Sequence, residues 1–272
     1  IFQAATETNV LALIVFAIIF GGALTTVGEK GATAIAFFQG ANEAVMKMVH
    51  LVMFFAPIGI YGLVAWNIAK NGGGEAFYEE IRKLGWYVGT VLLGLSLHVV
   101  FLSFVLMAVG RRNPISYLYG ILRALLTAMT TASSSASLPV TMECVEENNG
   151  VSKRSASFVL PLGATVNMDG TALYEAVAVI FIAQSLSMQL SLAKLVVIFF
   201  TATLAAVGAA GIPEAGLVTM VIVLQAAGVP VSGIGTILAI DWFLDRMRTT
   251  VNVCGDAIGC AVVDERVVKN EG

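Results

Sequence analysis

Long stretches without a charged side chain dominate the first 110 residues of the chain. Residues 8–28 and 48–69 form runs of 21 and 22 such residues, and a third run covers 84–110. About 20 apolar helical residues cross the hydrocarbon core of a bilayer, so each run predicts a membrane helix. Pro57 predicts a kink in the second of these helices.

The composition excludes several classes of protein. Hydrophobic residues make up 58% of the chain and charged residues only 12%, about half the charged share of a soluble domain. An ordinary cytosolic enzyme, a nucleic-acid-binding protein and a disordered protein all need more polar surface than this. A net charge of -3 is too small to imply a polyanionic partner. We therefore expect membrane lipid to surround the protein.

Three cysteines and two histidines have no spacing that predicts a site. Cys144, Cys254 and Cys260 match neither a metal-ligand motif nor a disulfide framework, so we expect them to pack as small apolar residues. His50 and His98 lie in the uncharged runs, and we expect them to be packed or interfacial.

After the third run the pattern changes and then repeats. Residues 114–145 form two short apolar halves, split by the hydroxyl-rich sequence TTASSSAS at 130–137. Each half is too short to cross a bilayer, so the segment predicts a re-entrant hairpin whose tip lines a wet cavity. Residues 195–228 repeat this design around GAAGIP, and each hairpin precedes a long apolar stretch with a polar centre, 158–186 or 234–263. Interrupted segments at matching places in two halves are typical of a transporter's binding site.

The last of these stretches has polar residues at spacings of 4, 3, 4 and 4: Asp241, Asp245, Arg248, Asn252 and Asp256. On a helix these positions fall within an arc of about 80°. One face of a membrane helix therefore has three carboxylates, a guanidinium and an amide. Each charged group costs about 2.5 kcal/mol or more at the bilayer centre. A purely structural charge network is the alternative, but it gives little reason for so many charged groups on one helix.

Arg248 indicates the class of ligand. A guanidinium is a two-pronged donor that matches a carboxylate. Asp245 can accept from an ammonium group, and Asn252 can donate to a second carboxylate. An acidic amino acid has these three groups. Alternatively, Arg248 pairs with Asp241 or Asp245, and the two states can alternate, with the internal pair filling the empty site.

The sequence NMDG, which interrupts the stretch before the second hairpin, predicts an ion site. Asn167 and Asp169 are two positions apart, so an unwound turn, helped by Gly170, would let both side chains and nearby carbonyls converge. Such oxygen ligands suit sodium. Glu175 follows without a basic neighbour in sequence. Burial disfavours its charged form, so it can carry a proton; the alternative is a snorkelling or hydrogen-bonded acid.

The acidic and basic side chains in these segments leave a net charge of -3 in a region poor in water. The five acidic residues are Asp169, Glu175, Asp241, Asp245 and Asp256, and the two basic residues are Arg246 and Arg248. Such a site requires cations, protons or both. The serine run at 133–135 lacks a G-x-S-x-G frame, and no histidine lies in this half of the chain, so we expect no enzyme. The run instead offers hydroxyls and backbone amides to a carboxylate.

Five long stretches are specific enough to indicate a family: SSSASLPVT at 133–141, EENNGV at 146–151, LPLGATVNMDGTALYEA at 160–176, VGAAGIPEAGLVTMVIVL at 207–224 and DWFLDRMRTTVNVCGDAIG at 241–259. They resemble the dicarboxylate/amino acid:cation symporter family, especially its animal excitatory amino-acid (glutamate) transporter branch, and the resemblance covers essentially the whole chain. It implies an all-α polytopic membrane protein with a glutamate-transporter-like elevator fold, two re-entrant helical hairpins, inverted repeats and a homotrimeric assembly.

The resemblance also implies a domain organisation. Residues 1–80 would hold the end of the fourth helix, near 9–27, and the fifth membrane helix, as part of a scaffold. Residues 81–272 would form the transport domain: the sixth helix, hairpin 1 near 114–147, the seventh helix near 155–187, hairpin 2 near 192–229 and the eighth helix near 232–263. The chain starts at Ile1 without an initiator Met, so we expect the N-terminal helices to be missing from it.

Site residues follow from the same resemblance. The substrate would contact Ser133, Ser134, Thr171, Ile212, Gly216, Asp245, Arg248, Thr249 and Asn252. Several sodium ions would be held by Gly163, Thr165, Asn167, Asp169, Ala206, Val207, Ala209, Asn252 and Asp256. Glu175 would couple transport to protons and potassium, and Ile212 and Gly216 would belong to the gate in hairpin 2.

The function implied is sodium-coupled symport of L-glutamate and L-aspartate by a multi-pass plasma-membrane protein, with proton co-transport, potassium counter-transport and an uncoupled chloride conductance. No organic cofactor and no nucleic-acid partner are expected. The alternatives are a sodium-dependent neutral amino-acid exchanger of the same family, against which Arg248 argues, and a transporter-like anion channel. Two departures from the family pattern, Ala206 and Glu214, bear on sodium affinity and on gating.

Overall fold

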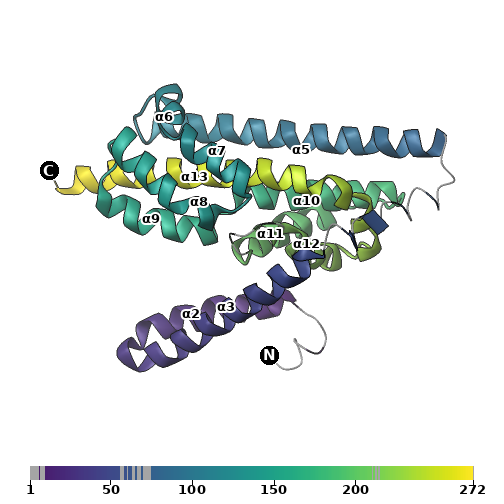
Figure 1. Ribbon diagram of the computed structural model, residues 1–272, viewed down its shortest axis with the longest axis horizontal. Coiled ribbons are helices and arrows are strands. Elements are labelled where there is room, and N and C mark those ends of the chain that lie inside the picture. The colour runs from purple at the N-terminus through teal and green to yellow at the C-terminus, as the bar shows by residue number, and fades with distance from the viewer. Residues whose placement is uncertain are drawn as a thin grey trace. The chain divides into compact units, whose positions relative to one another are not determined.

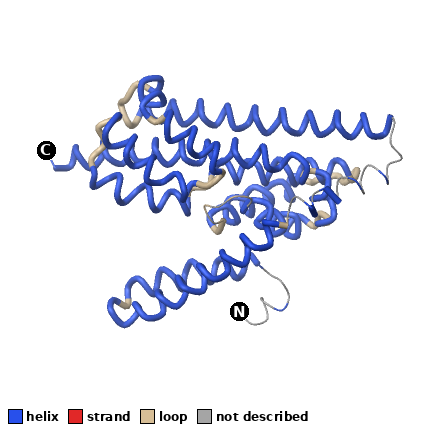
Figure 2. Tube along the Cα trace, viewed as in Figure 1, coloured by secondary structure: helices blue, strands red, loops and turns tan. Residues whose placement is uncertain are grey.

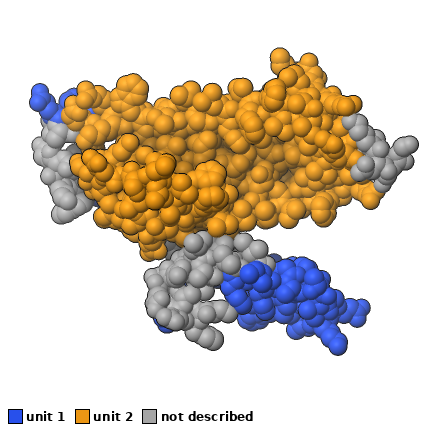
Figure 3. Space-filling model, turned by 180° about the vertical axis from the view of Figure 1, so that it is seen from behind, with its two compact units in different colours: residues 1–78 blue, residues 79–272 orange. Residues whose placement is uncertain are grey.

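The structure, a computed structural model, describes residues 6, 10–55, 58, 59, 61, 62, 65, 69, 75–209, 211, 213 and 215–271. All regular structure in these residues is helical, and no strand occurs among them (Figure 2). The all-helical class predicted from the sequence is therefore confirmed for this part of the chain. Two compact units, Ile1–Tyr78 and Glu79–Gly272, are coloured separately in Figure 3.

The first unit contains a pair of helices. α2 covers Val10–Thr26 and α3 covers Ala32–Phe54, with the 3-10 turn η1 at Gly28–Gly31 between them. Phe20 of α2 packs edge-on against Phe38 of α3, with 6.0 Å between the ring centroids. The short turn and this aromatic contact hold the two helices together.

The membrane helix expected at 48–69 falls only partly within the described residues. α3 begins at Ala32, well before this run, and ends at Phe54. Pro57, where the sequence predicts a kink, lies outside the described residues. The rest of this expectation therefore stays a prediction.

The α-helices of the second unit are, in chain order, α5 at Glu75–Ala108, α6 at Pro114–Gly120, α7 at Leu122–Thr131, α8 at Ser134–Glu143, α9 at Lys153–Val166, α10 at Asp169–Ser185, α11 at Leu192–Val207, α12 at Ala215–Ala227 and α13 at Leu238–Glu271. A π-helical turn, η2, follows α8 at Cys144–Asn148, and a 3-10 turn, η3, precedes α13 at Val231–Thr236. α13 runs unbroken through this unit and packs on α7, α9 and α10, and α5 runs along it (Figure 1).

Serine caps explain where several of these helices begin. Ser133 accepts a hydrogen bond from the Ala136 backbone N–H at 3.1 Å at the start of α8, directly after Ala132 ends α7 in a left-handed conformation. Ser152 and Ser191 cap α9 and α11 in the same way. Each such cap stabilises a helix by about 1 kcal/mol. The hydroxyl-rich sequence thus both ends one helix and starts the next.

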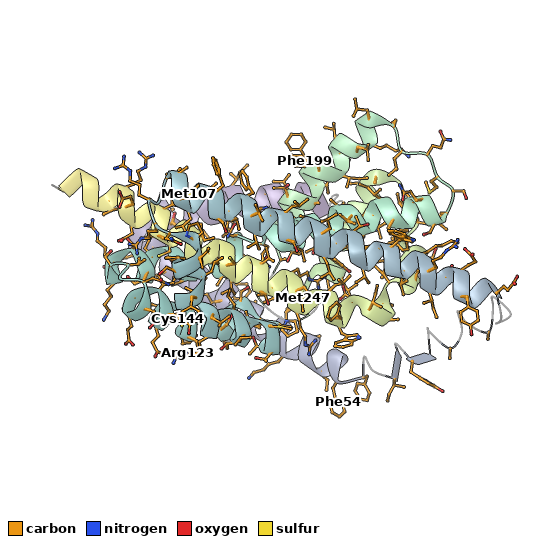
Figure 4. The ribbon with its side chains drawn as sticks, turned by 90° about the horizontal axis from the view of Figure 1, so that it is seen from above. Phe54, Met107, Arg123, Cys144, Phe199 and Met247 are labelled. Carbon is orange, nitrogen blue, oxygen red and sulfur yellow. The ribbon has the colours of Figure 1, made fainter. Side chains whose placement is uncertain are left out.

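The two helix pairs in this unit are closely packed. α7 lies against α8, and α11 against α12. Arg123, near the start of α7, pairs with Glu143 at the end of α8 at 2.5 Å; Figure 4 labels Arg123. Phe199 projects away from α11 in the same figure and is 62% exposed. Apolar side chains therefore face outward from a helix that has a buried opposite side.

Two apolar cores lie at the two ends of α13. One joins α13 to α5, α10, α11 and α12 and contains Tyr174 and Leu224. The other joins α13 to α5, α7 and α9 and contains Leu160 and Ile258. The polar residues of α13 are also buried: Asp241, Asp245, Arg248, Asn252 and Asp256. Charged groups withdrawn from solvent in this way need specific partners.

Two described segments are long and apolar enough to cross a membrane, Tyr78–Ala108 and Lys153–Ser185. The second is interrupted between α9 and α10, at Asn167 and Met168. α11 and α12 are apolar but shorter. α13 continues to Glu271, further than the eighth helix expected near 232–263.

Candidate functional site

The inner ends of the two helix pairs meet beside the middle of α13. Ser133 Oγ donates a hydrogen bond to the Gly211 carbonyl oxygen at 2.6 Å, and the Ser135 backbone N–H donates to the same oxygen at 3.2 Å. A Cβ on Gly211 would lie 2.5 Å from both Ala164 O and Ser135 Oγ. The hydroxyl-rich sequence therefore touches the glycine-rich sequence at a point where only glycine fits.

A small cavity lies at this contact. Seven of the nine residues expected to bind substrate line it: Ser134, Thr171, Gly216, Asp245, Arg248, Thr249 and Asn252. Ser133 is buried beside Ser134. Ile212 lies outside the described residues.

Arg248, 1% exposed, is the charged centre of this cavity. Its Nη1 donates to Asp241 Oδ1 at 3.1 Å, while Nε and Nη2 lie 3.0 and 2.8 Å from Asp245 Oδ1. The Tyr174 ring lies 4.2 Å from the guanidinium carbon, and its hydroxyl donates to Asp241 Oδ1. A Cβ on Gly216 would lie 2.9 Å from Arg248 Cζ, so α12 rests directly against the guanidinium. This arrangement is the internal ion pair, the alternative that the sequence leaves open for Arg248.

Arg246, the other arginine in this part of α13, contacts Trp242 on its own helix. Its Nη1 donates to the Trp242 carbonyl oxygen at 2.6 Å, and its guanidinium lies 5.4 Å from the Trp242 ring centroid. Arg248 is therefore the arginine that balances Asp241 and Asp245.

A second polar cluster lies where α9, α10 and α13 approach one another. Asn167 Nδ2 donates to Asp256 Oδ1 at 3.0 Å. The Gly170 backbone N–H donates to Asn252 Oδ1 at 2.7 Å and to Asp169 Oδ1 at 2.9 Å. The break between α9 and α10 thus brings the Asn167 side chain and the Gly170 backbone to the polar face of α13.

Glycines let the helix backbones approach this cluster closely. A Cβ on Gly255 would lie 2.8 Å from Asp169 Oδ2, and a Cβ on Gly163 would clash with the Asp256 carboxylate. A cavity of about 360 Å³ adjoins the cluster, and its polar lining consists of Asn167, Asp169 and Asp256. Within the described residues, no group of three or more His, Cys, Asp or Glu side chains could hold a metal ion. The ligands available here are instead two carboxylates, amide groups and backbone carbonyls, which suit sodium.

His98 of α5 belongs to this cluster, although the sequence predicts only a packed or interfacial histidine. Its Nε2 lies 2.6 Å from Asp169 Oδ2. The two residues are 71 positions apart, and an isolated histidine in an uncharged run gives no local signal for such a pair. The sequence offered only a general indication of this contact, namely that a partly buried carboxylate such as Asp169 needs a hydrogen-bond donor.

The other residues expected at the sodium sites lie in different surroundings. Ala206 and Ala209 are buried against Met168, next to the break between α9 and α10. Val207 is half-buried. Thr165 is exposed, and its hydroxyl donates to a carbonyl of its own helix at 3.0 Å. The structure does not bring Thr165 into the cluster.

Glu175 of α10 is fully buried, 0% exposed. The Thr219 hydroxyl of α12 donates to its Oε1. Its Oε2 has no hydrogen-bond partner in the described part of the chain. A carboxyl with so few donors is poorly suited to remain ionised.

Comparison with known proteins identifies the family to which this sequence is similar. The sequence model of the sodium:dicarboxylate symporter family matches residues 1–266. The chain is 51% identical over 264 residues to excitatory amino acid transporter 3 of Homo sapiens, a match that covers 97% of this chain and 49% of that protein. It is 50% identical over 262 residues to excitatory amino acid transporter 1 of Ambystoma tigrinum, covering 96% of this chain and 48% of that protein. The chain therefore spans about half the length of the curated relatives it matches.

Proposed function

This chain belongs to the sodium:dicarboxylate symporter family, and from that premise we propose that it binds and transports acidic amino acids, L-glutamate and L-aspartate, together with sodium. The family resemblance read from the sequence is thereby confirmed. Membership in a symporter family, together with two segments long enough to cross a bilayer, supports a membrane protein. The observation that supports the substrate is Arg248, buried between two carboxylates in a cavity.

Substrate binding would replace the internal partners of Arg248. A substrate carboxylate takes the place of Asp241 or Asp245 on the guanidinium, and the released Asp245 accepts from the substrate ammonium group. Asn252 Nδ2 already donates to Thr171 Oγ1 at 3.1 Å, which holds both side chains towards the cavity. The hairpin serines would meet the second carboxylate with hydroxyls and backbone amides.

Sodium would occupy the second cluster and the break beside it. Asp169 and Asp256 supply negative charge, and Asn167 and Asn252 supply amide oxygens once their present hydrogen bonds rearrange. Carbonyl oxygens near Gly163, Ala206, Val207 and Ala209 would complete the ligands, with Thr165 joining them only after its hydroxyl turns.

We extend the proposal to the architecture of the complete protein. α7 and α8 have 10 residues each, so each spans about 15 Å, half of a bilayer core. This length supports a re-entrant hairpin, and the α11–α12 pair supports its inverted repeat. The two compact units support a scaffold within residues 1–80 and a transport domain within residues 81–272. A homotrimer that works by an elevator movement in the plasma membrane is part of the same proposal.

Glu175 is proposed to carry the co-transported proton and to exchange it for potassium in the return step. Glu175→Gln mimics the protonated acid and cannot titrate. We expect it to keep sodium-dependent substrate binding and to lose the pH and potassium dependence of net transport. If potassium-driven cycling persists at the wild-type rate, Glu175 is only a packed acid.

The central experiment is uptake of radiolabelled aspartate by the complete protein in liposomes, with sodium, potassium and pH varied separately. The proposal predicts uptake that requires sodium and is competed by glutamate. Stronger competition by serine than by glutamate would indicate a neutral amino-acid exchanger instead. Anion currents without substrate counterflow would indicate a channel.

A further inference from the structure

Thr219 of α12 is the only hydrogen-bond partner that the described residues offer to the Glu175 carboxyl. The Thr219 hydroxyl also lies 3.1 Å from the Ala215 carbonyl oxygen and 3.4 Å from that of Gly216. A hydroxyl has one proton and two lone pairs. It can therefore donate fully to Glu175 or to its own helix, but not to both.

The protonation state of Glu175 selects between these two arrangements. When the carboxylate is ionised, Thr219 donates its proton to Oε1. When Glu175 is protonated on Oε1, the acid donates to Thr219 Oγ1, and the Thr219 proton turns to the Ala215 carbonyl. A proton on Oε2 instead would leave a buried donor without an acceptor, because Oε2 has no partner among the described residues.

The helices around this pair add one charged group that acts on it. Arg248 of α13 is that group. α12 and η3 contain no charged residue. Other ionisable side chains on the packed helices include Asp241 and Asp245, which hold Arg248, the phenols Tyr87 and Tyr174, His98, which contacts Asp169, and Lys194 in the first turn of α11. Thr219 is thus the neutral contact through which α12 meets the carboxyl.

The carbonyl groups that Thr219 can reach belong to the first turn of α12. Ala215 begins this turn, and Gly216 follows with its Cα against the Arg248 guanidinium. Strengthening the Thr219–Ala215 bond would fix this turn, and weakening it would loosen the surface on which Arg248 rests. A path of direct contacts therefore joins the Glu175 proton to the residue proposed to bind the substrate.

We propose that Thr219 is a positioning residue that transmits the protonation of Glu175 to the first turn of α12, and through Gly216 to Arg248. The proposal rests on the proposed role of Glu175 as the proton carrier. It makes the Thr219 hydroxyl, rather than the bulk of the side chain, the coupling element.

The test measures the apparent affinity of the complete protein for aspartate across a range of pH, at fixed saturating sodium. Thr219→Val removes the hydroxyl and keeps the shape. Because the hydroxyl stabilises the ionised carboxylate more than the neutral acid, its loss should move the midpoint of the pH dependence upward by about one pH unit. Thr219→Ser should restore the wild-type midpoint.

Matched variants separate this proposal from the one on which it rests. Thr203→Val removes an exposed hydroxyl that donates to the Phe199 carbonyl of its own helix, and it should not shift the midpoint. Size-exclusion profiles of all variants report on folding, and Thr219→Ala replaces Thr219→Val if the latter misfolds. If the pH profile is flat in Glu175→Gln but the midpoint in Thr219→Val is the same as in the wild type, the role of Thr219 alone is overturned. A wild-type pH profile in Glu175→Gln would overturn the proposed proton carrier, and the role of Thr219 with it.

Discussion

The two polar clusters along α13 differ in how their charge is balanced. Around Arg248, two carboxylates lie within 2.8 to 3.1 Å of the guanidinium. In the other cluster, Asp169 and Asp256 contact amide groups and one histidine, His98. Neither of these two acids pairs with a lysine or arginine within the described residues. One cluster thus contains a permanent counter-charge, Arg248, whereas the other contains only His98, which is charged only when it is protonated.

This difference indicates how each cluster responds to its ligand. An anionic group that binds Arg248 competes with two carboxylates that already lie within 2.8 to 3.1 Å of the guanidinium, so its binding involves an exchange of partners. A cation entering the second cluster displaces no lysine or arginine and neutralises carboxylates whose contacts are amide groups and one histidine. We therefore expect sodium to favour substrate binding, and substrate must favour sodium binding by the same factor.

The largest effect is expected from Arg248→Cys. Removing the guanidinium deprives Asp241 and Asp245 of their shared cation and the substrate carboxylate of its donor. Truncation of such a buried pair typically costs about 3–5 kcal/mol, more than a hundredfold in affinity. Uptake of acidic amino acids should be lost, while some binding of neutral amino acids remains.

Competition of serine and aspartate in an uptake assay measures this effect. Arg266→Cys, at an exposed position near the end of the same helix, is the matched control. Unchanged glutamate affinity in Arg248→Cys would rule out the proposed substrate site.

Asp256→Asn should have the next largest effect, and on the other cluster. It removes one negative charge and one strong oxygen ligand while leaving Arg248 and Asp245 in place. Sodium affinity should fall by about a hundredfold, and aspartate affinity should fall mainly at low sodium. Calorimetric titration of aspartate at several sodium concentrations measures both. Aspartate affinity that is independent of sodium in the unmutated protein would contradict the coupling.

His98→Ala should have a smaller effect on the same cluster. Loss of the ring removes the contact at 2.6 Å that orients the Asp169 carboxylate. Changes in residues that orient a metal ligand typically lower ion affinity by about tenfold. His98→Gln, which keeps a side-chain N–H donor, should retain more of the affinity. Equal sodium dependence in both variants and the wild type would assign His98 to packing alone.

Periodicity within one helix made part of this site predictable. Asp245, Arg248 and Asn252 recur at helical spacing, so their common face follows from the sequence and needs no knowledge of the fold. The positions of the helix breaks were also readable, because TTASSSAS and NMDG interrupt apolar runs with residues that favour caps and turns.

Contacts between helices could not be predicted in this way. Ser133 and Gly211 are 78 positions apart, and Glu175 and Thr219 are 44 apart. Each pair depends on which helices pack together and in what register, and a single sequence contains no local pattern for either. Thr165 illustrates the same limit, since its position beside the break is evident but the direction of its hydroxyl is set by the helix on which it lies.

The unbroken course of α13 has a consequence for the distance between the two clusters. Arg248 and Asp256 lie eight residues apart on one continuous helix, about 12 Å along its axis. Because α13 is one continuous helix, it fixes the separation of the two clusters independently of the neighbouring segments. Changes in the geometry of either cluster must therefore come from α9, α10 and α12, which pack against the side of α13. A single residue inserted within those eight would turn one cluster by about 100° relative to the other, and the two ligands would no longer meet on one face.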